Sequence, residues 1–442
     1  MPNIKTIRSN KLLQSVLGSS FFKGIGILFN LLLVRYSIGF IGAEKYGTWL
    51  TLLSFFTWFS AFEVGVSSSL RNRITPLFSD KKHLEIKRLI EKGYLALSCI
   101  YIPLILILVF LSYFLPISSL FTATNDNSSD IQLIFQVSLL LYFLHFITFF
   151  LNTVLLATHR AESTYLITAT QNGLLLFGVI LFKYLNLTPS LLLFCGWFSI
   201  APFIVWLMSG VTFFKTSLKS IKPEWNNLKL DLRTIFKGIN KNFFVMQICT
   251  LVIFSTDNII VLNYLSGTEV AKYNVAFKYF NIIVILFNLV LVPYWASFSE
   301  AAHKKNTKWI KKNIKRLIFL WISMLVLGSI MIILSPLAYQ YWIGQSLEIT
   351  ISLSIAMCLS FLLTTWNNIF SYFLNSISKT KVQSIVILIS ALINIPLSIL
   401  LINYYNSTGV IIATCISLIP LSIALPLHYR FVINKMEKES EE

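Results

Sequence analysis

Among the ionisable side chains inside apolar stretches long enough to cross a membrane, five are best placed to do chemistry. They are Lys23, Arg35, Glu63, Asp257 and Lys278. A charged group at the centre of a bilayer costs roughly 3 kcal/mol on insertion scales, so such groups usually pair with one another or face a protein cavity. Three of the five are cationic. A cavity that they lined would bind an anionic ligand through charge-assisted hydrogen bonds.

Lys23 lies near the middle of the apolar run 12–38, which is followed by a tight turn and a second apolar run. Asn30 belongs to the same polar stripe as Lys23, and Asn281 to the same stripe as Lys278, at helical spacing. We therefore add Asn30 and Asn281 to the candidate ligand-binding residues. The alternative is that these asparagines only hydrogen-bond to neighbouring helices.

Asp257 and Lys278 fall at comparable predicted depth in neighbouring spans, which leaves two interpretations open. In the first, the two residues form a structural ion pair. In the second, Lys278 joins Lys23 and Arg35 in lining a cationic cavity, and Asp257 takes part in gating or ion coupling. Arg35 could also extend to the outer headgroups.

Glu63 lies near the inner end of the second run and poses a similar choice. It pairs with Arg71 or Arg73, or it takes part in gating or ion coupling. His145 is a lone histidine on an otherwise apolar run, and a hydrogen-bonded interior histidine is favoured over a proton relay.

The composition is that of a multi-span membrane protein. The chain has 442 residues, of which 56% are hydrophobic and 12% charged, and its mean hydropathy is +0.74. An all-α polytopic protein with about twelve membrane-spanning helices is predicted. The apolar runs cover approximately 12–38, 46–70, 93–115, 131–157, 163–185, 188–214, 242–265, 269–298, 315–335, 348–376, 382–403 and 408–431.

Basic residues are confined to alternate connections between the runs. The net charge is +18, yet the connection 122–130 on the opposite side carries only acidic residues. Because Lys and Arg collect in cytoplasmic loops, this asymmetry places both termini in the cytoplasm. The basic loops are therefore explained by topology and contact with anionic lipid, and no nucleic-acid partner is predicted.

The longest polar connection divides the chain into two halves. We expect a bundle of six helices over 1–215, a basic cytoplasmic linker over 216–240, and a second bundle with a charged tail over 241–442. The segment Gly42–Tyr46 after the first run resembles Gly267–Tyr273 after the seventh, which indicates a parallel repeat. Two such bundles with a site between them are typical of transporters.

Several classes of site receive no support from the sequence. The five cysteines lie in or beside apolar runs, with no CxxC pair, so neither a disulfide framework nor a metal site is predicted. No nucleotide-binding motif occurs and no cofactor is expected. Short outer connections and the lack of paired carboxylates argue against a membrane enzyme, and we predict a protein that is not an enzyme.

The first hairpin and the seventh run carry a family resemblance. Val34-Arg35 leads into Gly42-Ala43-Glu44-Lys45-Tyr46-Gly47, and Phe62-Glu63-Val64-Gly65 with Leu70-Arg71-Asn72 follows. Together with Ser255-Thr256-Asp257-Asn258-Ile259-Ile260, these segments resemble the O-antigen and polysaccharide repeat-unit flippases of the multidrug/oligosaccharidyl-lipid/polysaccharide exporter superfamily.

The resemblance implies a bilobed bundle in the bacterial cytoplasmic (inner) membrane that works by alternating access. It implies transfer of an undecaprenyl-diphosphate-linked oligosaccharide, of O-antigen or capsule type, from the cytoplasmic to the outer leaflet. A polysaccharide polymerase and a chain-length regulator are then candidate partners. Lys23, Arg35 and Lys278 would contact the diphosphate or glycan, and Asp257 would gate or couple to an ion. A multidrug or small-molecule antiporter of the same fold, and a membrane polysaccharide polymerase, remain as alternatives.

Overall fold

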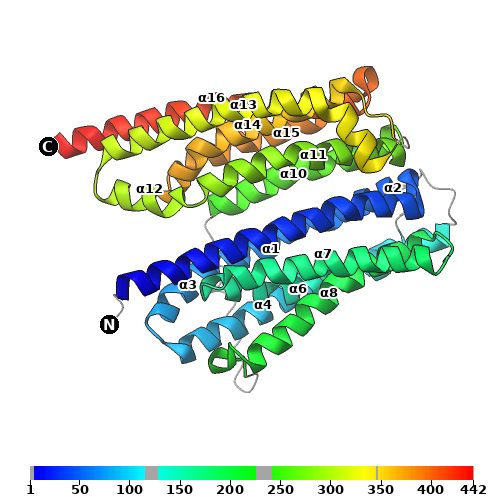
Figure 1. Cartoon of the computed structure of the whole chain (residues 1–442), viewed down its shortest axis with the longest axis horizontal. Helices are drawn as coiled ribbons and strands as arrows, with labels where there is room; N and C mark the ends of the chain where they lie inside the picture. Colours follow the sequence, from blue (N-terminus) through cyan, green and yellow to red (C-terminus); the bar gives the residue numbers. More distant parts are fainter. Residues whose placement is uncertain (1–3, 115–127, 225–240, 345–346, 442) are drawn as a thin grey trace. The chain divides into compact units, whose positions relative to one another are not determined.

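The computed structural model describes residues 4–114, 128–224, 241–344 and 347–441, and every regular element in them is a helix (Figure 1). Within these residues twelve helical segments are long and apolar enough to cross a membrane. The predicted all-α polytopic fold with about twelve spans is confirmed. The predicted linker 216–240 is described only as far as residue 224.

The chain divides into two compact units. Unit 1 comprises residues 1–52 and 59–240, and unit 2 comprises Leu53–Trp58 and residues 241–442. The helices of unit 1 are α1 (Ile4–Ile41), most of α2 (Ala43–Trp58), α3 (Ser60–Ser79), α4 (His83–Ser112), α6 (Ser128–Ala157), α7 (Ala161–Tyr184), α8 (Leu191–Lys215) and the short 3-10 helix η1 (Lys219–Ile221). Those of unit 2 are α10 (Lys241–Tyr264), α11 (Gly267–Leu291), α12 (Tyr294–His303), α13 (Thr307–Ile343), α14 (Ile351–Ser376), α15 (Lys381–Tyr405) and α16 (Ser407–Glu441).

The helices follow from apolar residues at helical spacing. On α8 the buried residues Leu191, Phe194, Phe198 and Val205 recur every three, four or seven positions, so they share one stripe that packs into unit 1. Other residues of α8, among them Leu192, Ile204 and Met208, are apolar and exposed. An apolar outer surface is expected where lipid replaces water.

The second span of each unit is interrupted, which the sequence patterns did not predict. α2 ends at Trp58 and α3 begins at Ser60, and the Phe62 backbone N–H donates to the Phe59 carbonyl at 3.3 Å across the break. The eighth span was predicted to continue to residue 298, but α11 ends at Leu291. Pro293, which lacks a backbone N–H, lies at this interruption as the N-cap of a separate helix, α12.

Two segments predicted as basic loops are largely helical. α4 starts at His83 and α13 at Thr307, each well before the predicted start of its apolar run. Lysine and arginine have good helix propensity, so these helices continue beyond the apolar stretch, with the charged side chains exposed on α13 and in part half-buried on α4. The basic residues are therefore carried on helix ends.

The connections of the two units correspond in backbone geometry. Non-glycine residues with positive φ lie in matching turns: Lys81 and Lys305 (58° and 52°), His159 and Ser378 (both 58°), and Asn186 and Asn406 (both 51°). The helix pairings also match, since α1 packs chiefly on α7 and α10 on α15, while α6 packs on α8 and α14 on α16. Both features agree with a parallel internal repeat.

Candidate functional site

Lys23 lies on α1 where this helix packs against α7. Its ammonium nitrogen is 5.8 Å from the centroid of the Tyr165 ring, and its side chain is half-buried. One turn along, the Asn172 amide donates to the Gly26 carbonyl at 3.0 Å. A Cβ at Gly26 would lie 3.7 Å from the Ala169 backbone, so the two helices approach closely here. The aromatic face supplies partial stabilisation of the cation and leaves the ammonium protons able to bind an anion.

Asn30 lies on the same face of α1 as Lys23 because seven residues make about two helical turns. Its side chain is half-buried, whereas that of Arg35 is exposed. The structure thus brings Lys23 and Asn30 together on one stripe and places Arg35 further along the helix at the surface of unit 1.

Glu63 is buried on α3, at 5% exposure, and the Ser67 hydroxyl donates to its carboxylate. One turn earlier the Tyr101 hydroxyl donates to the Phe59 carbonyl at 2.9 Å. The suggested pairing of Glu63 with Arg71 or Arg73 is wrong, since the described residues include no such ion pair. Both arginines are two or more turns further along α3, about 12 Å or more along the axis, and are exposed.

Asp257 is the most deeply buried of the acidic groups whose burial is described in unit 2, at 1% exposure. The Tyr273 hydroxyl on α11 donates to its Oδ2 at 2.5 Å, whereas Oδ1 has no hydrogen-bond partner. Thr414 on α16 also lies within interaction range of the carboxyl group. A buried carboxylate oxygen without a donor is costly, so this oxygen is available to a proton or a cation.

Asn394 on α15 extends the polar surroundings of Asp257. Its amide donates to the Thr414 hydroxyl at 3.2 Å, and the Thr414 hydroxyl donates to the Val410 carbonyl at 3.3 Å. The Asn394 side-chain oxygen is buried and has no donor. Asp257, Asn394 and Thr414 therefore supply oxygen atoms from α10, α15 and α16. Such hard ligands suit a proton or an oxygen-preferring cation.

Lys278 and Asn281 are half-buried neighbours on α11, three residues apart. The suggested ion pair between Asp257 and Lys278 is wrong, because neither side chain has an ionic partner among the described residues. Tyr273, which binds Asp257, precedes Lys278 by five residues. Lys278 thus lies about 7.5 Å further along α11 than the tyrosine that binds Asp257.

Sequence reasoning missed the polar face of α15. Ser390, Asn394 and Ser398 recur every four residues, each is fully buried, and each carries a side-chain oxygen without a partner. The spacing of four residues could have revealed this polar face. The run was nevertheless predicted only as one more apolar span, because serine side chains are small. A second set of polar residues that sequence reasoning missed connects α10 to α2 and α11. The Asn258 side-chain amide donates to the Ser54 hydroxyl at 2.7 Å, and the Asn274 side-chain amide donates to the Asn258 side-chain oxygen at 2.8 Å.

Among known proteins, the family model described as MatE matches residues 243–400. A solved multidrug resistance MATE family transporter of the MOP superfamily covers 96% of this chain and 99% of its own, with a TM-score of 0.76 at 13% identity. The lipid II flippase MurJ covers 95% of this chain and 87% of its own, with a TM-score of 0.66 at 20% identity. The fold is that of these membrane transporters and flippases.

Curated relatives are similar over nearly the whole chain. A Salmonella typhi protein that carries the provisional name O-antigen transporter is 23% identical over 90% of this chain and 91% of its own length. A Yersinia pseudotuberculosis protein, provisionally named O-antigen export protein, is 22% identical over 92% of this chain and 93% of its own. The predicted resemblance to O-antigen transport proteins is confirmed, since these relatives are named for O-antigen transport or export and the MatE model matches part of the chain.

Proposed function

We propose that this chain is a flippase for a lipid-linked oligosaccharide. It moves an undecaprenyl-diphosphate-linked O-antigen or capsule repeat unit from the cytoplasmic to the outer leaflet by alternating access. The similarity to proteins named for O-antigen transport supports the substrate class. The single observation that carries the proposal is Lys23, a cation within an apolar span that has an aromatic neighbour and no carboxylate partner among the described residues.

The substrate chemistry suits these residues. A diphosphate is strongly anionic, and Lys23, Arg35 and Lys278 offset the free energy of desolvating it. Asn30 and Asn281 supply amide donors and acceptors for the glycan. The polyprenyl tail stays in the bilayer throughout. A cationic drug would be repelled by the same residues.

Asp257 is assigned to ion coupling. Its carboxyl oxygen, the Asn394 oxygen and the Thr414 hydroxyl offer a place for a proton or a monovalent cation, whose binding would favour one conformation over another. Glu63 is assigned to gating in unit 1. Alternating access would then draw on an ion gradient, which fits a chain with no predicted nucleotide site.

We further propose a location in the bacterial cytoplasmic membrane with both termini in the cytoplasm. A polysaccharide polymerase and a chain-length regulator would use the exported repeat unit. These assignments rest on the distribution of basic residues and on the names of the relatives.

A multidrug or small-molecule antiporter is the second candidate function. The match of the MatE model and the high TM-score with a multidrug resistance transporter favour it. The charges of the candidate residues oppose it, because three of the five charged candidates, Lys23, Arg35 and Lys278, are cationic. An antiporter of cationic drugs needs a predominantly acidic cavity.

The test is complementation of a strain that lacks this gene, with surface polysaccharide and lipid-linked repeat units both measured. We expect Lys23→Ala and Lys278→Ala to lower surface polysaccharide at least tenfold, because a hydrogen bond to a charged group contributes about 1.5–3 kcal/mol. Repeat units should accumulate facing the cytoplasm at normal protein level. Lys23→Arg keeps the charge and should restore export, and Lys308→Ala, an exposed lysine of α13, is the control.

Full export by both alanine variants would overturn the substrate contacts. Drug resistance conferred by the wild-type chain, without any effect on polysaccharide, would establish the antiporter instead.

A further inference from the structure

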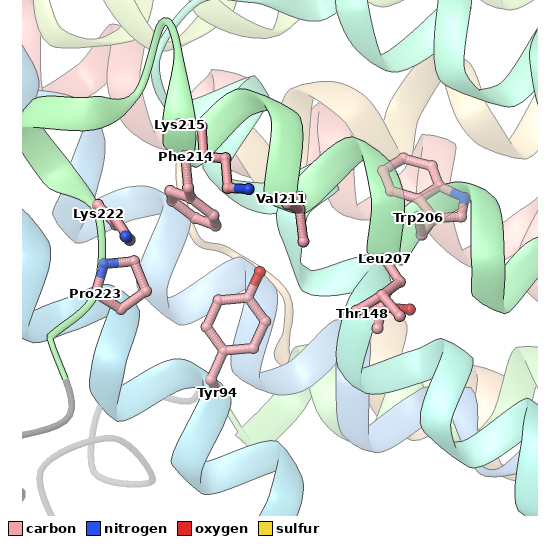
Figure 2. Close-up of a pocket in the computed structure, with 10 residues that line it drawn as sticks. Tyr94, Thr148, Trp206, Leu207, Val211, Phe214, Lys215, Lys222 and Pro223 are labelled. Carbon is pink, nitrogen blue, oxygen red and sulfur yellow. The ribbon is translucent and has the colours of Figure 1, made fainter.

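A cavity of about 350 Å³ lies within unit 1, among α4, α6, α8 and the segment after η1 (Figure 2). None of the residues assigned above to transport lines it. Figure 2 shows Lys215, Lys222, Phe214 and Pro223 gathered at one end, and Trp206 with Leu207 at the other. The cavity is therefore amphipathic: most of its lining is apolar, and its two lysines lie at one end.

The apolar end of the cavity opens towards lipid. Leu207 and Val211 line it and are 41% and 42% exposed on the outer face of α8. Behind them Trp206 is buried and packs edge-on against Phe149, with ring centroids 4.7 Å apart. Its indole N–H donates to the Gln171 side chain at 2.8 Å, so this wall is fixed. An acyl chain in the bilayer can reach it without entering water.

The cationic end carries two lysines without ionic partners among the described residues. Lys215 is in the last turn of α8, and Lys222 follows η1; both side chains are exposed. The nearby Lys87 differs, because Glu224 pairs with it. The two lysines suit the phosphate of an anionic lipid, and the apolar end of the cavity suits its hydrocarbon chain.

The position of Lys222 is fixed by contacts on both sides of it. Ile221 and Leu218 are buried in unit 1, at 1% and 2% exposure. After Lys222, the Glu224 carboxylate pairs with Lys87, and the Glu224 backbone N–H donates to the Glu91 carboxylate at 2.7 Å. The backbone of the segment is thus held on α4, and little backbone freedom remains to be lost when a ligand binds.

We propose that this cavity is a binding site for an anionic glycerophospholipid. The phosphate accepts hydrogen bonds from Lys215 and Lys222, and the upper part of one acyl chain lies against Leu207 and Val211. The volume is at the lower end of the range for ligand pockets, about 300–1,000 Å³. It therefore holds the phosphate and the start of one chain while the rest stays in the bilayer. This site does not depend on the proposed transport function.

The test is lipid binding to the purified full-length protein, measured by native mass spectrometry during titration with phosphatidylglycerol or phosphatidylcholine. We expect tight binding of phosphatidylglycerol. Lys215→Gln with Lys222→Gln should weaken it about 30-fold, since each lysine near an anionic headgroup contributes about 1 kcal/mol. The control is Lys219→Gln with Lys308→Gln, which removes the same charge from exposed lysines that do not line the cavity.

A second pair of variants tests the apolar end of the cavity without changing the charge of the protein. Leu207→Trp fills the apolar end and should weaken phosphatidylglycerol binding, whereas Met208→Trp, on the adjacent exposed face of α8, should not. Equal binding of phosphatidylcholine, or no loss in the double lysine variant, would overturn the site. Displacement of the lipid by millimolar inorganic phosphate or glycerol phosphate would show a free-anion site and would also overturn it.

Discussion

Asp257 is held in one orientation by a single hydroxyl group, and its second oxygen has no donor. Tyr273 fixes Oδ2, and the Asn394 and Thr414 oxygens lie on the neighbouring helices α15 and α16. A carboxyl group that is fully buried within a membrane has no water to stabilise its charge. Its charge state therefore depends on the binding of a proton or a cation. This dependence is the physical basis for assigning ion coupling to Asp257.

At the residue scale, we predict that Asp257→Asn abolishes export while the protein still accumulates in the membrane. The asparagine amide is nearly isosteric with the carboxyl group, and its oxygen still accepts a hydrogen bond from the Tyr273 hydroxyl. The packing is therefore retained, and only the titratable group is lost. Tyr273→Phe should reduce export about tenfold, since a hydrogen bond to a charged group contributes about 1.5–3 kcal/mol. Both are measured as surface polysaccharide against membrane protein level.

Tyr264→Phe provides the matched control, because this tyrosine is exposed at the end of α10. Wild-type export by Asp257→Asn would show that the carboxyl group plays no part in coupling.

The turn between α15 and α16 depends on one glycine, Gly409. Its backbone N–H donates to the Asn406 carbonyl at 2.9 Å. A Cβ on this residue would lie 2.2 Å from the Leu401 carbonyl oxygen, a backbone atom that no side-chain rotation can remove. The two helices can therefore approach this closely only with glycine, and their packing positions Asn394 beside Thr414.

At the element scale, Gly409→Ala should destabilise unit 2, because overpacking typically costs about 1–3 kcal/mol. The measurement is thermal unfolding of the purified protein in detergent. Gly196→Ala is the control: a Cβ there would have no heavy atom within 4 Å, and alanine favours the helix. An unchanged melting temperature for Gly409→Ala would show that the backbone of the turn shifts to accommodate the added Cβ without loss of stability.

The distribution of charge over the whole molecule determines its orientation in the bilayer. Lys379 and Asn406 lie at opposite ends of α15, a helix of 25 residues, and both are exposed. A helix of this length crosses the hydrocarbon core once, so the two residues emerge on different sides. From the excess of Lys and Arg on one side, we propose that the Lys379 side faces the cytoplasm.

At the scale of the molecule, we predict that cysteine at Asn406 reacts with a membrane-impermeant maleimide in intact cells, whereas cysteine at Lys379 reacts only after lysis. Cys99→Ser provides the background, because Cys99 is the exposed native thiol and the other four are buried. The reverse pattern would invert the topology and, with it, the proposed direction of transport.

Much of the architecture could be predicted because it depends on local composition. Long apolar runs predicted twelve spans, and the tight turn predicted after the first run contains Gly42 with φ of 81°. Lys23 stood out because a charge within an apolar run is visible in the sequence itself. Its aromatic neighbour Tyr165 belongs to a helix distant in sequence, and no local pattern could have identified it.

The sequence by itself determined that this chain is a helical membrane protein, and it determined which charged groups the bilayer must accommodate. The tertiary structure decided which groups meet. It separated Asp257 from Lys278 and placed Asp257 with Tyr273, Asn394 and Thr414. It also placed Lys215 and Lys222 at one cavity. The physical reason is that spans follow from hydropathy, a local property, whereas contacts between helices depend on their rotation and axial offset, which long-range packing alone sets.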